Sequence, residues 1–371
     1  MNILLAPDSF KGTLSSREVC ETEAHAICDV LPDAQITMLP MADGGEGMVD
    51  ACLSVFGGER TVCRVIGADG NPVDAAYALL PDGSAAIEMA AAAGLPLMRS
   101  RLDPLHATTY GVGELLRNAQ SRGAKRILLG LGGSATNDCG IGMAAALGWR
   151  FLNADGVQVA PLAGNLGKIA VIEPPQENLE AEVFAACDVD SPLLGAQGAT
   201  YVFGPQKGVT EAIKPQLEAD MAHFAAVLKK AFPDFDAAAP SAGAAGGMGA
   251  AVITFLSGTL RPGIELLLDA ANFDALAARA DLIITGEGRM DAQSLHGKVP
   301  CGVAKRAQRA GKPCIAVCGA LGDGAERMKE VGITALYAAS DGHRTEEELQ
   351  KTCRGALDAA MRKAISEQFG R

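Results

Sequence analysis

Short polar segments rich in glycine, acidic residues and small hydroxyl side chains follow apolar runs at several points in the chain. The densest is GLGGSATNDCG, residues 130–140, which lies between the apolar run KRILL and the apolar stretch IGMAAALGW. Bare backbone lets N–H groups approach phosphate oxygens, and the beginning of a helix adds positive potential. The residues predicted to hold nucleotide phosphates or a sugar acid are Gly132, Gly133, Ser134, Thr136, Asn137 and Asp138.

Two similar segments stand near the beginning of the chain, PDSFKGTLS after the first apolar run and PMADGGEG after the second. Lys11 is predicted to contact a phosphate or carboxylate during catalysis, because a cation can offset charge on a phosphoryl group in transfer. Asp43 is predicted to be the general base or a Mg²⁺ ligand. Asp8, Ser9 and Gly12 are predicted to bind the substrate.

A third group of candidates follows the apolar run DLIIT, in the segment GEGRMDAQSLHGKVP. Arg289 or Lys298 is predicted to hold a substrate carboxylate, because guanidinium and ammonium groups bind carboxylates well. Glu287, in the same segment, is predicted to lie at the nucleotide.

Further candidates lie in CDVDSPLLG and FGPQKG. If the preceding strand continues through this segment, Asp188 and Asp190 share a face, because side chains repeat every second residue along a strand. Such a pair suits a metal ion, and Asp188 is the alternative to Asp43 as general base. Lys207 is predicted to contact an anion of the nucleotide.

These residue types together suit phosphoryl transfer from a nucleotide to a small alcohol. Glycines and helix beginnings accommodate phosphates, carboxylates hold Mg²⁺, and one carboxylate accepts the proton of the attacking hydroxyl. The residues therefore predict a nucleotide and Mg²⁺ as cofactors. The P-loop pattern GxxxxGK[ST] does not occur in the sequence.

Composition narrows the possible functions. The chain has 371 residues with a formal net charge of −12, which argues against a nucleic-acid partner because phosphate backbones require basic patches. No apolar stretch approaches the length of a membrane-spanning helix. The ten cysteines are scattered without a CxxC pair, and the N-terminal segment lacks a basic, then apolar, export pattern. We expect a cytoplasmic protein with reduced thiols. Its expected partner is a small-molecule substrate, and the sequence leaves open whether the chain forms a homo-oligomer.

Apolar runs alternate with amphipathic stretches at both ends of the chain, which predicts a parallel α/β sheet. Strands are expected at 2–6, 35–40, 280–288, 312–319 and 333–339, and helices at 15–31, 45–57 and 345–368. Hairpin signals in DGNP and PDGS predict an antiparallel meander over 60–90. We predict a discontinuous α/β domain from 1–60 and 275–371, and a mixed α/β domain from 61–274.

Nine segments in order resemble the bacterial type-1 glycerate kinases: APDSFKGTLS, PMADGGEG, TTYGVGEL, GLGGSATNDCGIGMAAALG, CDVDSPLLG, FGPQKG, AGGMGAA, TGEGRMDAQSLHGKVP and CGA. The resemblance extends from residue 1 to about residue 340. It implies ATP-dependent phosphorylation of D-glycerate on the 2-hydroxyl, giving 2-phosphoglycerate. It also implies that the domain built from both chain ends is flavodoxin-like.

Two other functions stay open on the residues alone. GLGGSA fits the dinucleotide pattern GxGxxA, and Asp155 follows at the distance of a ribose-binding acid, so an NAD-dependent oxidoreductase is one alternative. A sugar-acid binding module without catalysis is the other, although an acidic ligand disfavours a site with many carboxylates.

Overall fold

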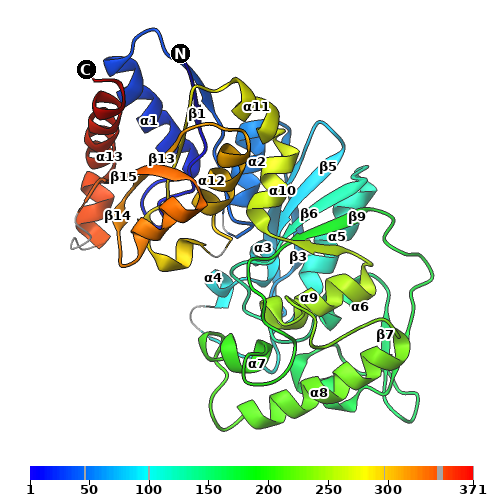
Figure 1. Cartoon of the computed structure of the whole chain (residues 1–371). Helices are drawn as coiled ribbons and strands as arrows, with labels where there is room; N and C mark the ends of the chain where they lie inside the picture. Colours follow the sequence, from blue (N-terminus) through cyan, green and yellow to red (C-terminus); the bar gives the residue numbers. More distant parts are fainter. Residues whose placement is uncertain (46, 99–100, 296, 341–345, 371) are drawn as a thin grey trace. The chain divides into compact units, whose positions relative to one another are not determined.

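A computed structural model describes residues 1–45, 47–98, 101–295, 297–340 and 346–370, and divides the chain into two units (Figure 1). Unit 1 comprises Met1–Asp43, Asp50–Gly57 and Pro262–Arg371. Unit 2 comprises Gly44–Val49 and Gly58–Arg261. Both chain ends therefore belong to unit 1, and the middle of the chain forms unit 2.

Unit 1 contains a five-stranded parallel sheet in the order β15-β13-β11-β1-β2. Numbered along the chain within this sheet, the order is 2-1-3-4-5, which is the flavodoxin-like arrangement. The strand order reverses between the neighbours β1 and β11: β2 is added on the side of β1, whereas β13 and β15 are added on the side of β11. The strands are β1 (Asn2–Leu5), β2 (Gln35–Met38), β11 (Leu282–Thr285), β13 (Cys314–Cys318) and β15 (Ile333–Ala338).

Helices cover both faces of this sheet. The main ones are α1 (Ser16–Val30), α10 (Gly263–Ala270), α11 (Phe273–Arg279), α12 (Val299–Arg309) and α13 (Glu346–Phe369). Helices α1 and α13 pack side by side, and their buried side chains form one hydrophobic core with the sheet (Figure 1). Helices α11 and α12 contact β1, β11 and β13. The smaller elements are α2 (Met48–Phe56), the parallel pair β12 (Arg289–Met290) and β14 (Ala320–Leu321), and the 3₁₀ turns η3 (Ala292–Leu295) and η4 (Ala325–Val331).

Helix α1 begins where its sequence dictates. Ser15 is the N-cap: its hydroxyl accepts the Glu18 backbone N–H at 3.3 Å, and the Glu18 carboxylate accepts the Ser15 N–H at 3.0 Å. This reciprocal pair is a capping box, which satisfies backbone donors that the first helical turn leaves open. The beginning of α1 is therefore closed by its own side chains.

Unit 2 contains a six-stranded mixed sheet in the order β10-β9-β6-β5-β4-β3. The first four are parallel, and β4 and β3 are antiparallel to their neighbours. The strands are β3 (Glu59–Ile66), β4 (Pro72–Leu79), β5 (Ser84–Glu88), β6 (Arg126–Gly130), β9 (Glu182–Ala186) and β10 (Thr259–Arg261), with a separate antiparallel pair β7 (Arg150–Leu152) and β8 (Val171–Glu173).

Seven helices and two 3₁₀ turns complete the described part of unit 2. They are α3 (Ala90–Ala93), α4 (Leu95–Met98), α5 (Tyr110–Ser121), α6 (Ile141–Ala146), α7 (Ala199–Val202), α8 (Lys214–Ala231), α9 (Ala244–Phe255), η1 (Ala163–Lys168) and η2 (Pro205–Lys207). Aromatic side chains meet in the core, where the Trp149 and Phe255 rings lie 5.0 Å apart between centroids. Among the described residues, no helix combines the length and the hydropathy that a bilayer span requires.

The predicted fold class is confirmed: one sheet is parallel and built from both chain ends, and the other is mixed. The antiparallel meander predicted over 60–90 is formed by β3, β4 and β5. The segment 183–195 is expected to be a strand that runs into a polar loop; the strand β9 ends at Ala186, so it does not continue through Asp188 and Asp190. This difference affects the candidate metal ligands described below.

Gly286 offers a test of the packing at the end of β11. A Cβ at Gly286 would lie 1.9 Å from the Val317 carbonyl oxygen of the neighbouring strand β13, which is backbone and cannot move aside cheaply. We expect Gly286→Ala to lower the free energy of unfolding by about 1–3 kcal/mol. Urea unfolding followed by circular dichroism measures the change.

Gly355 is the matched control in the same unit. It is exposed within α13, and a Cβ there meets no atom within 4 Å. Gly355→Ala should raise the free energy of unfolding by about 0.5–1 kcal/mol, because alanine favours the helix. Equal changes in the two variants would contradict the packing described at Gly286.

Candidate active site

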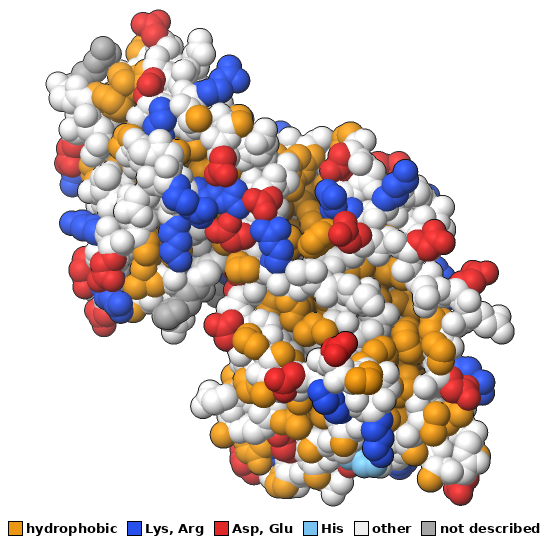
Figure 2. Space-filling model, turned by 45° about the vertical axis from the view of Figure 1, so that its right-hand side comes forward, with side chains coloured by type: hydrophobic (Ala, Val, Ile, Leu, Met, Phe, Trp, Pro, Cys, Tyr) orange, Lys and Arg blue, Asp and Glu red, His pale blue; other side chains and the backbone are white. Residues whose placement is uncertain are grey.

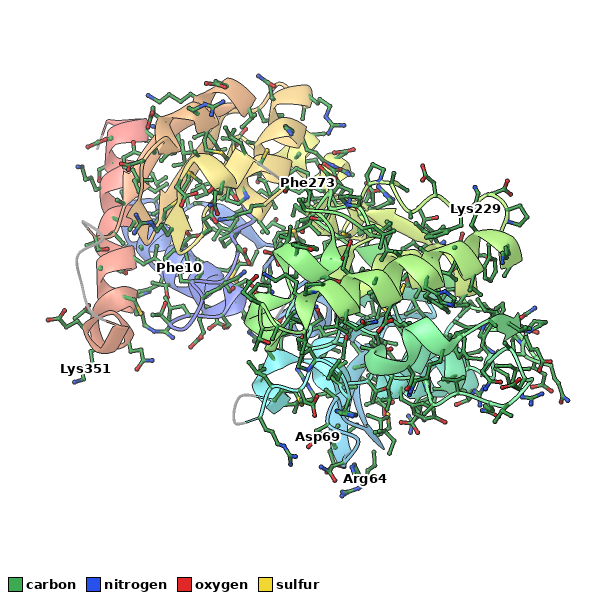
Figure 3. All side chains as sticks on the ribbon, turned by 90° about the horizontal axis from the view of Figure 1, so that it is seen from below. Phe10, Arg64, Asp69, Lys229, Phe273 and Lys351 are labelled. Atoms are coloured by element: carbon green, nitrogen blue, oxygen red, sulfur yellow. The ribbon has the colours of Figure 1, made fainter. Side chains whose placement is uncertain are left out.

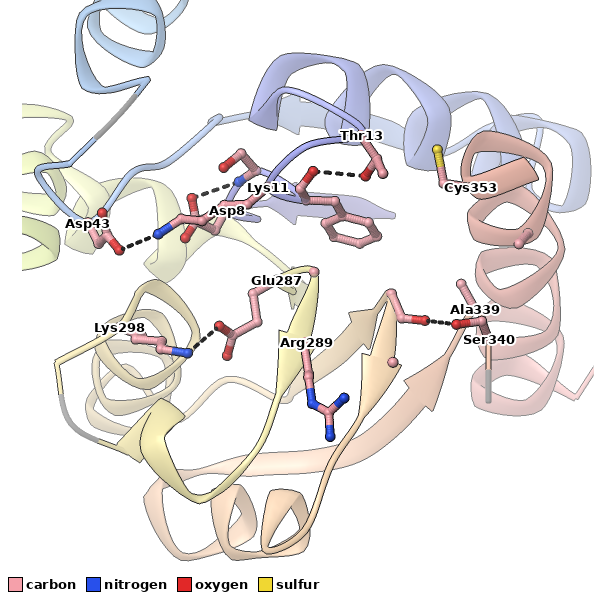
Figure 4. Close-up of a pocket in the computed structure, with 16 residues that line it drawn as sticks. Asp8, Lys11, Thr13, Asp43, Glu287, Arg289, Lys298, Ala339, Ser340 and Cys353 are labelled. Carbon is pink, nitrogen blue, oxygen red and sulfur yellow. Dashed lines mark hydrogen bonds and ion pairs between the residues drawn. The ribbon is translucent and has the colours of Figure 1, made fainter. Parts of the chain in front are cut away.

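A cavity of about 370 Å³ lies at the carboxyl edge of the unit 1 sheet (Figure 4). In open parallel sheets this edge binds ligands, most often where the direction of sheet growth reverses. That point lies between β1 and β11. Loops that follow these two strands supply most of the charged side chains of the cavity, namely Asp8, Lys11, Glu287, Arg289 and Lys298, and Asp43 follows β2.

Asp8 is the most strongly perturbed carboxyl group of the cavity. Its backbone N–H donates to the Gly286 carbonyl at 2.8 Å, which fixes the loop after β1 against the loop after β11. Only 5% of Asp8 is exposed, and burial, followed by repulsion from Asp43, raises the pKa of its carboxyl to about 7. A carboxyl with this pKa can accept or release a proton near neutral pH.

Lys11 and Asp43 form an exposed ion pair beside Asp8. The Lys11 Nζ lies 3.5 Å from Asp43 Oδ2, and the charge of Asp43 is the main reason that the pKa of Lys11 is raised. The Lys11 side chain is 70% exposed, so solvent screens this pair and it contributes little to stability. Its ammonium group therefore stays accessible to an anionic ligand.

Glu287 and Lys298 form a second, more buried pair. The Lys298 Nζ donates to Glu287 Oε2 at 3.2 Å, from the N-cap position of α12. Glu287 is 5% exposed, and burial raises its pKa although Ser294 and Lys298 oppose the rise. Its Oε1 is buried without a hydrogen-bond partner in the described part of the chain. This oxygen is available to a further donor or cation.

The remaining residues predicted in these two loops differ in position. Ser9 lines the cavity and donates its backbone N–H to Asp8 Oδ1 at 2.7 Å. Arg289 lines it from β12, with its guanidinium directed away from Lys11 and Asp43 in the view of Figure 4. Gly12 is not among the lining residues; with φ at 79° it forms the turn after Lys11.

The glycines of the 130–140 segment meet protein backbone in unit 2. A Cβ at Gly130 would lie 2.4 Å from the Gly44 carbonyl oxygen, and a Cβ at Gly132 would lie 2.6 Å from the Gly45 Cα. Gly133 turns the chain with φ at 73°. Gly130 and Gly132 therefore allow residues 44–45 to pack closely against this segment. This packing gives no support to the predicted contact with nucleotide phosphates.

Asp138 is fully buried and accepts backbone N–H groups at the beginning of helix α6. Its Oδ2 accepts the N–H and hydroxyl of Thr109 at 2.9 and 2.8 Å, and its Oδ1 accepts the Gly140 N–H at 3.1 Å. The Gly142 N–H donates to the same carboxylate at 3.3 Å. These bonds join the beginning of α6 to the beginning of α5, so both oxygens of Asp138 are occupied within the protein.

Lys207 is buried beside the same segment. Its Nζ donates to the Ser134 hydroxyl at 2.8 Å and to the Thr136 carbonyl at 2.7 Å, and burial lowers its pKa to about 7. Thr136 Oγ1 and Asn137 Oδ1 are buried there without a hydrogen-bond partner among the described residues. A role for these residues in nucleotide binding stays a prediction.

Asp188 and Asp190 lie beyond the end of β9. Since the strand stops at Ala186, the alternation that would place both carboxylates on one face does not apply. Asp188 is half-buried and Asp190 is exposed. Their predicted role as metal ligands stays a prediction.

The carboxylates of the unit 1 cavity can serve Mg²⁺ without a complete protein cage. In the described residues, no group of three or more His, Cys, Asp or Glu side chains is arranged to hold a metal. Mg²⁺ bound with a nucleotide commonly takes one or two carboxylates, with phosphates and water as its other ligands. The unpartnered Oε1 of Glu287 and the repulsion between Asp8 and Asp43 fit such a cation.

Sequence reasoning missed one wall of the cavity. Ala339 and Ser340 line it after β15, and Cys353 and Ala356 line it from α13. These neutral side chains carry no recognisable motif. Their only signal was that residue 339 ends an expected strand of the parallel sheet and residue 340 follows it.

Comparison with known proteins gives consistent matches over nearly the whole chain. The model of the glycerate kinase family matches residues 3–367. A protein named glycerate kinase from Halalkalibacterium halodurans is 44% identical over 91% of this chain and 90% of its own length. A glycerate 2-kinase from Escherichia coli is 42% identical over 98% of this chain and 96% of its own.

A solved structure shares the fold. A crystal structure of a protein provisionally described as glycerate kinase 2, from Salmonella typhimurium LT2, superposes with a TM-score of 0.90 at 38% identity. The match covers 100% of this chain and 98% of that one.

The raised pKa of Asp8 predicts a pH-dependent stability. Between pH 3.8 and about 7 the folded protein keeps a proton on Asp8 that the unfolded chain has released, so the free energy of unfolding falls as pH rises. Asp8→Asn removes this loss. The variant should match the wild type near pH 4 and exceed it by pH 8, by on the order of 4 kcal/mol at most.

Urea unfolding at several pH values measures this difference. Asp33→Asn, at an exposed position of the same unit, is the control for the loss of a carboxylate. A pH-independent difference for Asp8→Asn would show that Asp8 is ionised throughout the range.

Proposed function

The chain belongs to the glycerate kinase family, whose members are phosphotransferases acting on an alcohol group, and we propose that it transfers the γ-phosphoryl group of ATP to D-glycerate. The relative from Escherichia coli is named a glycerate 2-kinase, which supports the 2-hydroxyl as acceptor and 2-phosphoglycerate as product. The site that carries this proposal is the unit 1 cavity.

One observation supports this site above all: lysines and carboxylates converge at the point where the parallel sheet reverses its growth. Lys11 and Lys298 can balance charge on phosphate oxygens, and Asp8 and Asp43 stand beside Lys11. Phosphoryl transfer needs positioned cations and a proton acceptor more than covalent chemistry. The face shown in Figure 2 has lysine and arginine side chains interspersed with acidic ones, without a single basic tract such as nucleic acid requires.

In the proposed reaction the glycerate hydroxyl attacks the γ-phosphorus in line with the leaving ADP oxygen. A new O–P bond forms, the bond to ADP breaks, and the hydroxyl proton passes to a carboxylate. Asp43 is the proposed acceptor, because Lys11 beside it holds the attacked phosphoryl group within reach. Asp8, with a pKa of about 7, is placed to take up that proton or share it.

Mg²⁺ is proposed as the metal of the donor nucleotide. When bound, it supplies charge neutralisation on the phosphates. Asp8, Asp43 and Glu287 are the candidates to hold it. Glu287 is the strongest candidate ligand, because its buried Oε1 has no hydrogen-bond partner among the described residues.

The dinucleotide alternative loses its structural basis. The glycines at 130 and 132 lie against the backbone of residues 44–45, and Asp155 is exposed on the loop between β7 and β8. A binding module without catalysis leaves the clustered lysines and carboxylates without a role.

Incubation with glycerate and Mg-ATP tests the function directly. We expect 2-phosphoglycerate and ADP in equal amounts, identified by mass spectrometry and ³¹P NMR. Chelation of the metal should abolish turnover and added Mg²⁺ should restore it. Formation of 3-phosphoglycerate would overturn the proposed acceptor, and ATP turnover that does not depend on glycerate would overturn the proposed substrate.

Asp43→Asn tests the proposed proton acceptor. The amide cannot take the proton, so kcat should fall by about a hundred- to ten-thousand-fold, while the KM for ATP changes little. Steady-state kinetics measure both constants, with Asp33→Asn as the control that keeps normal turnover. A kcat close to that of the wild type would remove Asp43 from this role.

A further inference from the structure

The unit 1 cavity follows the whole carboxyl edge of the sheet. The loop after each strand supplies at least one lining residue; taking one from each loop in the spatial order of the strands, these are Asp43, Asp8, Glu287, Gly319 and Ala339. Five adjacent strands span about 19 Å at the usual strand spacing. A three-carbon acid would occupy only a fraction of this length.

Charge is unevenly distributed along the cavity. Among the lining residues that the structure describes, the charged ones follow β2, β1 and β11 in the chain, whereas those that follow β13 and β15, and those on α13, are neutral. Figure 4 shows Ala339, Ser340 and Cys353 on the side opposite to Asp43 and Lys298. A ligand that fills the cavity therefore needs an anionic part and an uncharged part.

Small side chains create the space at the neutral end. Ala339 directly follows β15, and Cys353 and Ala356 lie three residues apart on one face of α13. Helix α13 is anchored through Leu357, which is fully buried in the core that also contains Phe10 (Figure 3). The Ser340 hydroxyl donates to the Gly319 carbonyl at 2.9 Å.

We propose that this cavity binds the nucleotide, with the base and ribose at the β13–β15 end and the phosphates at the Lys11–Lys298 end. The inference rests on the proposed function in taking a nucleotide as phosphoryl donor. An extended nucleoside triphosphate has the required length and the required division into a neutral part and an anionic part. Glycerate has no uncharged part of comparable size.

This assignment differs from most of the sequence-based division of roles. Residues 132–138 were expected to hold nucleotide phosphates or a sugar acid, and Asp8, Arg289 and Lys298 were expected to hold the acid. Glu287 was already predicted to lie at the nucleotide. With the base at β15 and α13, the γ-phosphoryl group reaches the charged end, beside Asp43. The acceptor hydroxyl must then approach at that end.

Replacing Ala356 with leucine tests the neutral end. The larger side chain fills space beside Cys353, so Ala356→Leu should weaken the binding of MgADP and of adenosine by about tenfold or more. Isothermal titration without glycerate measures both ligands on the full chain. Ala359→Leu is the matched control, since this alanine is exposed on the same helix, and it should bind both ligands as the wild type does.

Kinetics separate the two substrates. The KM for ATP should rise in Ala356→Leu while the KM for glycerate changes by less than about twofold. An increase confined to the KM for glycerate, or wild-type affinity for MgADP, would overturn the assignment. If circular dichroism shows that Ala356→Leu does not fold, Ala339→Leu is used in its place, because it narrows the same end of the cavity. The same changes in KM and in MgADP affinity then test the assignment.

The titrations also distinguish this inference from the proposed function. If the chain does not phosphorylate glycerate but MgADP affinity falls in Ala356→Leu and not in Ala359→Leu, the nucleotide site stands and the acceptor is wrong. If the wild type does not bind MgADP, the nucleotide site itself is refuted.

Discussion

The parallel pairing of β1 with β11 is the constraint on which the candidate site depends. It aligns Ile3 with Leu282 and places the loop after β1 against the loop after β11, where the Asp8 N–H donates to the Gly286 carbonyl. Residues from opposite ends of the chain thereby share one edge of a sheet. In this sheet β1 is followed by β2 on one side and β11 is followed by β13 on the other, so the connections after β1 and β11 lead in opposite directions and a cavity can form between them.

Burial then gives the charged groups of this edge their chemical character. Asp8 and Glu287 are withdrawn from water, so their pKa values rise, while Lys11 stays exposed and its pKa is raised by Asp43. A site with buried carboxyl groups and exposed ammonium groups can receive an anionic ligand at the rim and exchange a proton beneath it. Neutral side chains of β15 and α13 extend the same cavity away from the charges.

Much of this could be predicted from sequence, for physical reasons. Alternating apolar and amphipathic runs indicated the parallel sheet, and polar residues after strands marked the loops at its carboxyl edge. The α1 cap was readable because Ser15 and Glu18 act locally. Residue types alone could not distinguish Lys11, which is exposed, from Lys207, which is buried with Ser134 and the Thr136 carbonyl as partners. The sequence pattern likewise did not show that β9 ends at Ala186. The expectation that Asp188 and Asp190 share one face of a strand depended on that strand continuing.

The contribution of α13 to the cavity could not be predicted either, because Cys353 and Ala356 contribute shape and no charge.

The central claim is that one continuous cavity in unit 1 holds the phosphoryl donor. The most direct measurement is a crystal structure of the chain with Mg²⁺ and a non-hydrolysable ATP analogue. The account predicts the base beside Cys353 and the γ-phosphate within reach of Lys11. An analogue bound instead along residues 130–138, with the unit 1 cavity empty, would contradict it.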